Sequence, residues 1–282
     1  MNELLWHPRT SQLVAHLQGA LPQGLVIEGP SGIGVVATAK YLAKAVGAQI
    51  FVIEPKKSKE GKMVVDKEEG NIIIDDIRQL YEQTRTSQAT TQVYIFDTGE
   101  RSMTTAAQNA FLKLLEEPRA GLHFIIATHH SDQLLPTIMS RSQRLSLLSL
   151  TNTQVDALIA ELGIDDPVKK ARLAFVGNGL PALIKRLAAD DKAYERRVEL
   201  MSDAKTMLAG AVYQKIVTIH KRKDSRADAL TLLDDMNHQL KVILQSKPDT
   251  KLARDINRYL EARQKILAGA NIRLQLTSAV LQ

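Results

Sequence analysis

Residues 25–40 read LVIEGPSGIGVVATAK, and this stretch decides the class of fold. It begins with a short apolar run that suits a buried strand, passes through a glycine-rich turn, and continues into residues of helical character. Phosphate-binding loops occur in such strand–turn–helix units, because glycines let backbone amides point at an anion and the helix N-terminus adds its dipole. The sequence therefore contains a candidate phosphate loop at Gly29, Pro30, Ser31, Gly32 and Gly34.

The rest of the first half repeats this alternation of strand-like and helix-like segments. Further apolar runs occur at 49–53, 92–97 and 122–128, with a fifth strand candidate at 143–148. Unbroken apolar strands separated by helices are typical of a parallel sheet that helices cover on both faces, so we predict an α/β fold. The clearest helix follows Thr104, which can cap it, and has one apolar stripe at positions 107, 110, 111, 114 and 115.

The composition narrows the class of protein. Of the 282 residues, 44% are hydrophobic and 24% are charged, which is ordinary for a soluble globular chain. No apolar run reaches the roughly 20 residues that a membrane span needs, so we expect a cytoplasmic protein without a membrane partner. The chain has no cysteine, which excludes disulfides, thiolate nucleophiles and thiolate zinc sites. Its seven histidines form no ligand pattern, and we expect no metal site.

From about residue 151 the sequence pattern becomes wholly helical. We expect an α/β module at 1–149, a small helical unit at 150–190 and an all-helical domain at 191–282. The formal net charge of +6 arises in 191–282, which holds 17 Lys and Arg residues against 11 Asp and Glu. A basic segment can face nucleic acid or an acidic partner, and it can equally be a solvated helical surface. The candidate contacts are Lys221, Arg222, Lys223 and Arg226.

The candidate phosphate loop lacks two groups that nucleotide hydrolysis requires. The full motif is G-x-x-x-x-G-K-[ST], whose lysine reaches the β- and γ-phosphates and whose hydroxyl binds Mg²⁺. Val35 and Val36 occupy these two positions. Losing a charge-assisted hydrogen bond, worth about 1.5–3 kcal/mol, lowers affinity by roughly one to two powers of ten. We therefore interpret the loop as a strand-to-helix turn that keeps its glycines without binding nucleotide usefully.

A second ATPase-like motif has a matching defect. Residues 93–97 form an apolar strand that presents Asp97 at its carboxyl end, where an ATPase holds its metal ion. A working ATPase then needs a glutamate to polarise the attacking water, and this chain has Thr98 at that position. Threonine cannot act as a base near neutral pH. Both halves of the ATP chemistry are therefore missing from the sequence.

Residues 134–142 indicate a short helix that begins near Pro136 and ends near Arg141. An arginine at a helix end can bind an external phosphate through two parallel hydrogen bonds. Taken alone, such an arginine is more often one half of a surface ion pair. Arg141, flanked by Ser140 and Ser142, is thus a candidate whose role depends on its context.

Three of these segments, in this order, resemble the bacterial clamp-loader subunits of the AAA+ family. Residues 107–118, AQNAFLKLLEEP, are very similar to the helix after the second ATPase motif of that family. Residues 124–128, FIIAT, resemble its sensor-1 strand, with Thr128 at the sensor position. Residues 134–143, LLPTIMSRSQ, resemble its Ser-Arg-Cys motif, with Ser142 in place of the cysteine. The resemblance covers about residues 22–150, and the helical remainder is similar only in layout.

Within the family, the defective loop resembles the delta-prime branch of DNA polymerase III, because the gamma/tau ATPase subunits keep the lysine and the glutamate. The resemblance implies an AAA+ module with a degenerate phosphate loop, a helical lid at 150–190 and an oligomerising collar at 191–282. It also implies a subunit that hydrolyses nothing and serves as a rigid stator. Such a subunit would donate Arg141 as an arginine finger to ATP bound by a neighbour.

The same resemblance implies partners and cofactors. The partners are gamma/tau-like ATPase subunits and a delta-like subunit in a hetero-pentameric ring, which loads a sliding clamp onto primed DNA during replication. This chain would meet DNA only indirectly and carry no cofactor, with ATP and Mg²⁺ bound in its neighbours. Many members have a four-cysteine zinc module that this chain cannot form, so we expect no zinc. The charged segment 56–69 takes that region, and we expect an exposed insertion with a small hairpin.

Two other functions remain open from the sequence. One is an active gamma/tau-like ATPase with an unusual phosphate loop, which binding and turnover of ATP by the isolated chain would favour. The other is a DNA-binding module that uses the basic C-terminal region, which salt-dependent binding of duplex DNA would favour.

Overall fold

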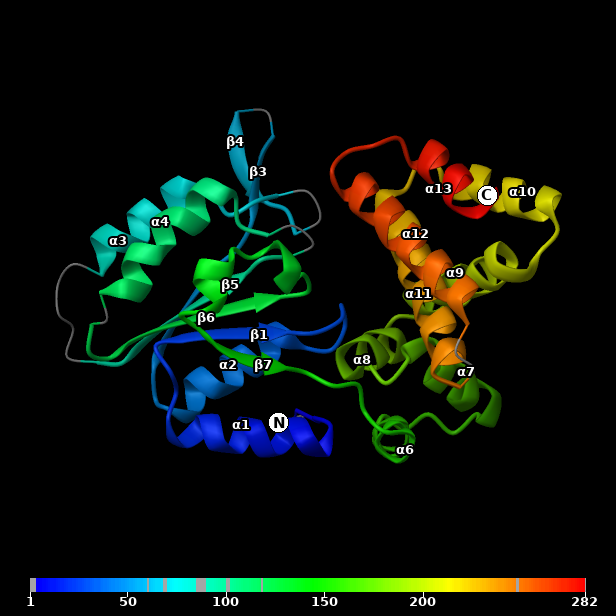
Figure 1. The fold of residues 1–282 in the computed structure, drawn as a ribbon. Coiled ribbons are helices and arrows are strands. Elements are labelled where there is room, and N and C mark those ends of the chain that lie inside the picture. The colour runs from blue at the N-terminus through cyan, green and yellow to red at the C-terminus, as the bar shows by residue number, and fades with distance from the viewer. Residues whose placement is uncertain are drawn as a thin grey trace. The chain divides into compact units, whose positions relative to one another are not determined.

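The computed structural model describes residues 4–59, 61–67, 70–84, 90–99, 102–117, 119–246 and 249–281. The chain divides into two compact units, Met1–Arg186 and Leu187–Gln282 (Figure 1). The division falls inside helix α8 (Pro181–Ala189), close to the expected boundary at 190/191. Pro118, the last residue of the clamp-loader-like helix block, lies outside the described residues.

The first unit is built on a parallel sheet, which confirms the predicted α/β class. Its strands lie in the order β2 (Gln49–Ile53), β5 (Gln92–Asp97), β6 (Leu122–Thr128), β1 (Gly24–Glu28) and β7 (Gln143–Ser146). β7 ends two residues before the end of the strand candidate at 143–148. Since every pair in this sheet is parallel, the carboxyl ends of the strands share one edge, where Glu28, Asp97 and Thr128 lie.

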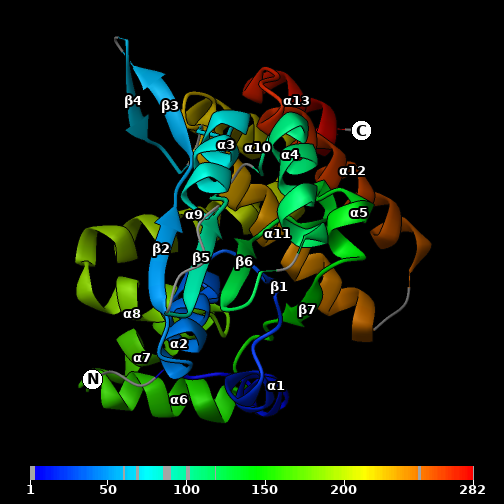
Figure 2. The same cartoon turned by 90° about the vertical axis from the view of Figure 1, so that its left-hand side faces the viewer.

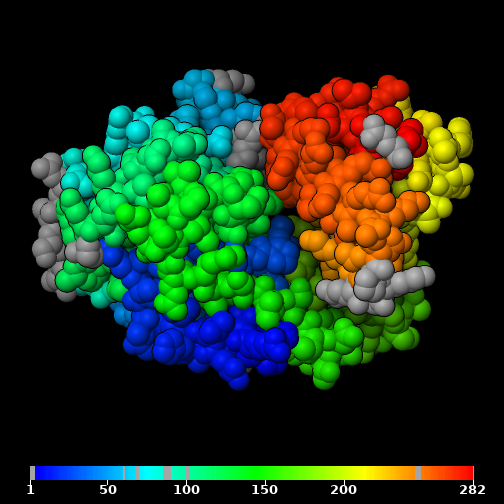
Figure 3. Space-filling view, viewed as in Figure 1, coloured from blue at the N-terminus to red at the C-terminus, as the bar shows by residue number. Residues whose placement is uncertain are grey.

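Helices cover both faces of the sheet (Figures 1 and 2). One layer consists of α1 (Pro8–Gly19) and α2 (Val35–Ala45), and the other of α3 (Ile74–Gln83) and α4 (Thr105–Glu116). The outer side of α1, dark blue in Figure 3, faces solvent. On the other face, Phe111 of α4 packs against Phe96 and Phe124 of the strands, with ring centroids 4.9 and 5.3 Å away. These rings belong to the hydrophobic core between the sheet and helices α3 and α4.

A short antiparallel hairpin, β3 (Lys56–Lys59) and β4 (Lys62–Val65), projects from the end of β2 (Figure 2). It lies in the charged segment that the sequence predicts to be an exposed insertion, and its strands are largely exposed. Further along, a 3₁₀ turn (Ser131–Gln133) and the short helix α5 (Pro136–Met139) connect β6 to β7.

The region 150–190, all of which the structure describes, forms α6 (Asn152–Glu161), α7 (Pro167–Gly177) and α8. Leu158, Leu173 and Ile184, one from each helix, are fully buried. A glycine at 177 leaves room for the third of these side chains, because a Cβ there would come within 2.4 Å of it. This helical region is compact and belongs, up to Arg186, to the same unit as the sheet.

The second unit is helical throughout its described residues. Its elements are α9 (Asp191–Ala209), α10 (Val212–Arg222), α11 (Arg226–Ser246), α12 (Thr250–Leu267) and α13 (Ile272–Leu281). Their apolar faces meet in one core that includes Met207, Ile219, Leu233, Ile266 and Leu276. Arg197 of α9 and Asp235 of α11 form a buried ion pair beside this core. Across the parts of the chain that the structure describes, no helix is both long and apolar enough to cross a bilayer.

Candidate functional site

The predicted phosphate loop joins β1 to α2 at the carboxyl edge of the sheet. Gly32 and Gly34 have φ angles of 89° and 99°, a left-handed conformation that glycine adopts without steric strain. Gly34 immediately precedes the first turn of α2, so the loop leads into a helix N-terminus. The backbone scaffold of a phosphate loop is therefore present.

The two residues that follow Gly34 lack the ammonium and the hydroxyl of the full motif. Val35, at the position of the missing lysine, is 2% exposed and belongs to the apolar core. A lysine ammonium buried at this position would be costly without a charged partner. Val36 is half-buried and offers no hydroxyl to a metal ion. The two valines therefore belong to the packing of α2 rather than to an anion site.

The first turn of α8 lies directly against the loop. The backbone N–H groups of Ala182 and Leu183 donate to the Gly32 carbonyl oxygen at 3.0 and 3.1 Å. A Cβ atom at Gly32 would come within 2.8 Å of the Leu183 Cβ, so a side chain there would clash. His129 holds the start of the loop, with its Nδ1 donating to the Gly29 carbonyl oxygen at 2.8 Å. The N-terminal N–H groups of α8, at the positive end of its dipole, are thus bound to a carbonyl oxygen of the loop. They are not available to an anion.

The carboxylate of Asp97, at the end of β5, interacts with a lysine from the hairpin segment. Asp97 is 5% exposed, and its Oδ2 lies 2.5 Å from Nζ of Lys67, which also lies 2.9 Å from Oε1 of Glu54. Burial alone would lower the pKa of Lys67, but its hydrogen bonds to the two carboxylates outweigh that effect and raise the pKa. This contact could not be predicted, because nothing in the charged segment 56–69 distinguishes one lysine from the others.

Thr98 follows Asp97 and is equally inaccessible. It is 1% exposed, and its Oγ1 donates to the Ala127 carbonyl oxygen at 3.3 Å. A hydroxyl bound to the neighbouring strand cannot orient an attacking water as a catalytic carboxylate would. Thr98 therefore lies just beyond the end of β5 and is hydrogen-bonded to β6.

The arrangement at this edge does not fit a nucleotide-bound Mg²⁺ ion. Such an ion needs available oxygen ligands from the loop and the second motif. Here the loop supplies valines, and the carboxylate of Asp97 is neutralised by an ammonium. Among the described residues, no group of three or more His, Asp or Glu side chains is placed to hold a metal ion.

Two further strand ends complete the carboxyl edge. Thr128, at the sensor-1 position, is 1% exposed, and its Oγ1 accepts the His130 N–H at 3.0 Å. Glu28 lies beside it in register, and its Oε1 accepts from Arg144 Nη2 at 2.7 Å and from Ser146 Oγ at 2.5 Å. Burial alone would raise the pKa of Glu28, but hydrogen bonds from arginine and serine side chains lower it overall. These polar groups are thus used for contacts within the chain.

The segment 140–142 lies at the opposite, amino edge of the sheet. It precedes β7, whose first residue, Gln143, pairs with Leu25. At about 3.3 Å per residue, the four steps from Leu25 to Gly29 put the phosphate loop about 13 Å further along the strand. Arg141 is therefore separated from the loop of its own chain by at least the length of β1.

The Arg141 side chain is 40% exposed and only loosely held. Its Nη2 lies 2.9 Å from Oε1 of Glu116 at the end of α4, and its Nη1 donates to the Thr137 carbonyl oxygen at 3.2 Å. Exposed ion pairs of this kind contribute about 0.2–1 kcal/mol. A stronger anionic partner can therefore take the guanidinium from Glu116 at little cost.

The basic cluster predicted to contact DNA or a partner is partly internal. Arg222 is 6% exposed, and its guanidinium lies 2.7 Å from Asp203 and 3.0 Å from Asp228. Lys221 lies 2.5 Å from Glu199. Arg222 therefore joins helices α9, α10 and α11 and is not at the surface, contrary to what its place in the cluster suggests. The two other members, Lys223 and Arg226, are partly exposed.

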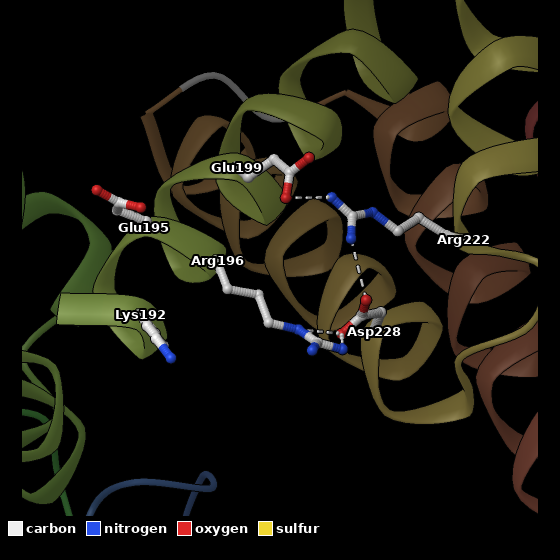
Figure 4. A pocket seen from close by; sticks show the side chains of 6 residues that line it. All are labelled: Lys192, Glu195, Arg196, Glu199, Arg222 and Asp228. Atoms are coloured by element: carbon white, nitrogen blue, oxygen red, sulfur yellow. Dashed lines mark hydrogen bonds and ion pairs between the residues drawn. The ribbon is translucent and has the colours of Figure 1, made fainter. Parts of the chain in front are cut away.

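An open cavity of about 570 Å³ lies beside this junction, and Figure 4 shows the side chains that line it. Its lining consists of three cationic and three anionic side chains: Lys192, Glu195, Arg196, Glu199, Arg222 and Asp228. Arg196 reaches Asp228 at 2.7 Å, and hydrogen bonds from Lys221 and Arg222 lower the pKa of Glu199. Because the opposite charges balance, the cavity has no excess charge with which to bind a phosphate.

Comparison with known proteins identifies the family to which this chain is similar. Residues 10–151 match the model of a family described as "DNA polymerase III, delta subunit". The chain is 29% identical over 158 residues to the DNA polymerase III subunit gamma/tau of Mycobacterium tuberculosis (strain H37Rv), covering 51% of this chain and 27% of that relative. It is 30% identical over 154 residues to subunit tau of Bacillus subtilis, covering 50% and 27%.

A third relative is the DNA polymerase III subunit delta' of Haemophilus influenzae, 36% identical over 86 residues, which are 30% of this chain and 26% of that one. The chain thus spans about a quarter of the length of the curated relatives it matches. Among solved structures, a gamma subunit-related protein of Thermotoga maritima has a TM-score of 0.51 at 17% identity, with 96% and 97% coverage. A Thermotoga maritima RuvB mutant reaches 0.50 at 16%, with 71% and 73% coverage. At these identities the likeness shows the fold alone, which is the predicted AAA+ type.

Proposed function

The chain belongs to the DNA polymerase III, delta subunit, family, and from this premise we propose that it is a non-catalytic, delta-prime-like subunit of the clamp loader. It acts as a stator in a ring with gamma/tau-like ATPase subunits and a delta-like subunit. Its Arg141 contacts ATP held by a neighbouring subunit while the ring loads a sliding clamp onto primed DNA. ATP and Mg²⁺ belong to the neighbours.

The observation that carries this proposal is the state of the carboxyl edge. Val35 is buried in the core, α8 donates two hydrogen bonds to Gly32, and Lys67 neutralises Asp97. The position of the motif's lysine thus holds an apolar side chain, the first turn of α8 lies against the loop, and the carboxylate that could bind a metal ion already has a cationic partner. Turnover in this chain would require all three to be undone together.

The position of Arg141 supports action on another chain. The guanidinium lies at the amino edge of the sheet, whereas the phosphate loop lies at the carboxyl edge, about 13 Å away along β1. An arginine supplied from outside an ATP site stabilises charge that develops on the γ-phosphate, and can be worth about 10³–10⁵ in rate in GTPases. Arg141 is half-exposed and weakly paired, as such a group has to be.

Replacing Arg141 tests the proposal in the reconstituted assembly. We expect Arg141→Ala to leave the chain folded and incorporated, and to lower ATP turnover of the assembly by about tenfold or more. Arg141→Lys keeps the charge without the two-pronged geometry and should give an intermediate rate. Arg78→Ala is the control, because Arg78 is an exposed arginine in a surface ion pair on α3. Wild-type turnover in Arg141→Ala would rule out the finger role.

The gamma/tau relatives favour a second candidate, an active ATPase, because they match half of this chain. In that case the isolated chain would hydrolyse ATP, and the loop contacts with α8 would open during the cycle.

The mass of the complex formed on mixing this chain with candidate ring subunits tests the proposed partners directly. Failure to join gamma/tau-like subunits would contradict the stator proposal.

A further inference from the structure

Backbone hydrogen bonds join the base of the β3–β4 hairpin to the residues just before and after it. Lys56 and Asn71 exchange both of their backbone N–H···O bonds at 3.1 Å, and the Asp66 N–H donates to the Pro55 carbonyl oxygen at 3.0 Å. The Lys56 ammonium also lies 2.9 Å from Asp76 of α3. Asp66, which follows β4, is therefore held in a defined position although the strands of the hairpin are largely exposed.

This position presses the main chain of Lys67 against the turn after β5. A Cβ atom at Gly99 would come within 2.4 Å of the Lys67 carbonyl oxygen and 3.1 Å of its Cα, so no side chain fits there. Gly99 also has a φ of 61°, which favours glycine. The close approach of the two backbones brings the lysine beside the end of β5, where Asp97 stands.

The lysine side chain joins two neighbouring strand ends. Its Nζ lies 2.5 Å from Oδ2 of Asp97 at the end of β5, and 2.9 Å from Oε1 of Glu54, which directly follows β2. The other oxygen of Asp97 accepts the Gly99 N–H at 3.3 Å. The Asp97 side chain is 8% exposed, so its negative charge needs a partner, and a second carboxylate nearby adds to that need.

We propose that Lys67 is a built-in cation that takes the place of a divalent metal ion between Asp97 and Glu54. It offsets part of the negative charge at the carboxyl edge and keeps this edge folded with neither metal nor nucleotide bound. The Lys67 ammonium is part of the chain and does not have to be bound from solution. A Mg²⁺ ion would have to lose some of its bound water to take the same place, which is unfavourable. The inference deepens the proposed function, since it says how an edge without nucleotide is stabilised, but it does not depend on the ring or on Arg141.

Thermal unfolding of the full chain with and without a divalent ion tests this proposal. In EDTA we expect Lys67→Met to lower the Tm of the first unit by about 3–6 °C, because two carboxylates lose their shared cation. About 5 mM MnCl₂ should restore most of that loss, since Mn²⁺ accepts carboxylate and water ligands. Lys62→Met is the control, because it removes an exposed lysine from the same hairpin. Adding Mn²⁺ should change the Tm of this variant and of the wild type by less than about 1 °C.

A second variant identifies the carboxylate and guards against a folding failure. Lys67→Met combined with Asp97→Asn removes one charge of each sign, so its Tm in EDTA should lie above that of Lys67→Met and no longer rise with Mn²⁺. Electron paramagnetic resonance should find about one Mn²⁺ bound per chain in Lys67→Met and none in the double variant.

Two results would overturn the proposal. One is a wild-type Tm in Lys67→Met, which would make the lysine an ordinary surface pair. The other is a loss that Mn²⁺ does not repair, together with a double variant that is no more stable. Neither result bears on ATP turnover in the assembly, so a failure here is distinguishable from a failure of the proposed function.

Discussion

The two edges of the parallel sheet use their polar groups in opposite ways. At the carboxyl edge, Gly32, Asp97 and Glu28 all bind partners within the chain. At the amino edge, Arg141 is half-exposed and held by a surface ion pair with Glu116. One sheet thus carries a closed site and an open one, about 13 Å apart along β1. Under the proposed function, the chain would supply an arginine from its open edge to a reaction that its closed edge does not perform.

The largest effect that sharpens this comparison concerns Gly32. An alanine there adopts an unfavourable left-handed conformation and also meets Leu183 of α8, so we expect Gly32→Ala to lower the free energy of unfolding by about 2–5 kcal/mol. Gly47 is the matched control, because it has a φ of 66° and open space around it. Gly47→Ala should lose only about 1–2 kcal/mol.

Urea unfolding followed by tryptophan fluorescence measures both glycine variants. Trp6 is the one tryptophan in the sequence and belongs to the first unit, where its Nε1 donates to Thr38 at 2.9 Å and its ring packs on Tyr41. Equal losses in the two variants would mean that α8 does not press on the loop, and the carboxyl edge would then be open.

A smaller effect follows from Glu28, also at the carboxyl edge. Its folded-state pKa is lowered below the ordinary value of 4.5, so the charged carboxylate adds stability above pH 4.5 that is lost as the pH falls through the folded value. Glu28→Gln should therefore be less stable than the wild type by about 1.5–3 kcal/mol above pH 4.5, and the gap should narrow in acid.

The pH dependence of the unfolding midpoint measures this gap. Glu161→Gln, at an exposed position on α6, serves as the control and should follow the wild type throughout. A difference between Glu28→Gln and wild type that stays constant from neutral to acid pH would show that the charge of Glu28 is not what matters.

The smallest effect is expected at the amino edge. Glu116→Gln removes the surface partner of Arg141 and should change the free energy of unfolding by no more than about 1 kcal/mol. ATP turnover of the reconstituted assembly should stay within about twofold of wild type, because the arginine remains available. A severe loss of stability in this variant would instead make Arg141 a structural residue and remove the contrast between the edges.

Local patterns in the sequence predict the elements of the sheet well. Apolar runs mark the strands, and Thr104 caps α4 as expected, its hydroxyl accepting the Ala107 N–H at 3.3 Å. These features depend on neighbouring residues, so a linear pattern reveals them. The end of β7 at Ser146 was less predictable, since strand ends depend on the partner strand.

The contacts that close the carboxyl edge could not be predicted in this way. Lys67 and Asp97 are 30 positions apart, and α8 meets Gly32 from 150 positions further along the chain. Such pairs depend on how whole elements pack, and nothing at either residue marks its partner. Arg222 illustrates the same limit, because a basic cluster in sequence gives no sign that acidic residues of α9 and α11 enclose one member.

Equilibrium dialysis of the isolated chain against ATP and Mg²⁺ tests the central claim most directly, namely that this chain has filled its own nucleotide site. We expect no bound nucleotide and no hydrolysis at ATP concentrations up to about 1 mM. Binding of one ATP per chain in the micromolar range, with turnover, would contradict it.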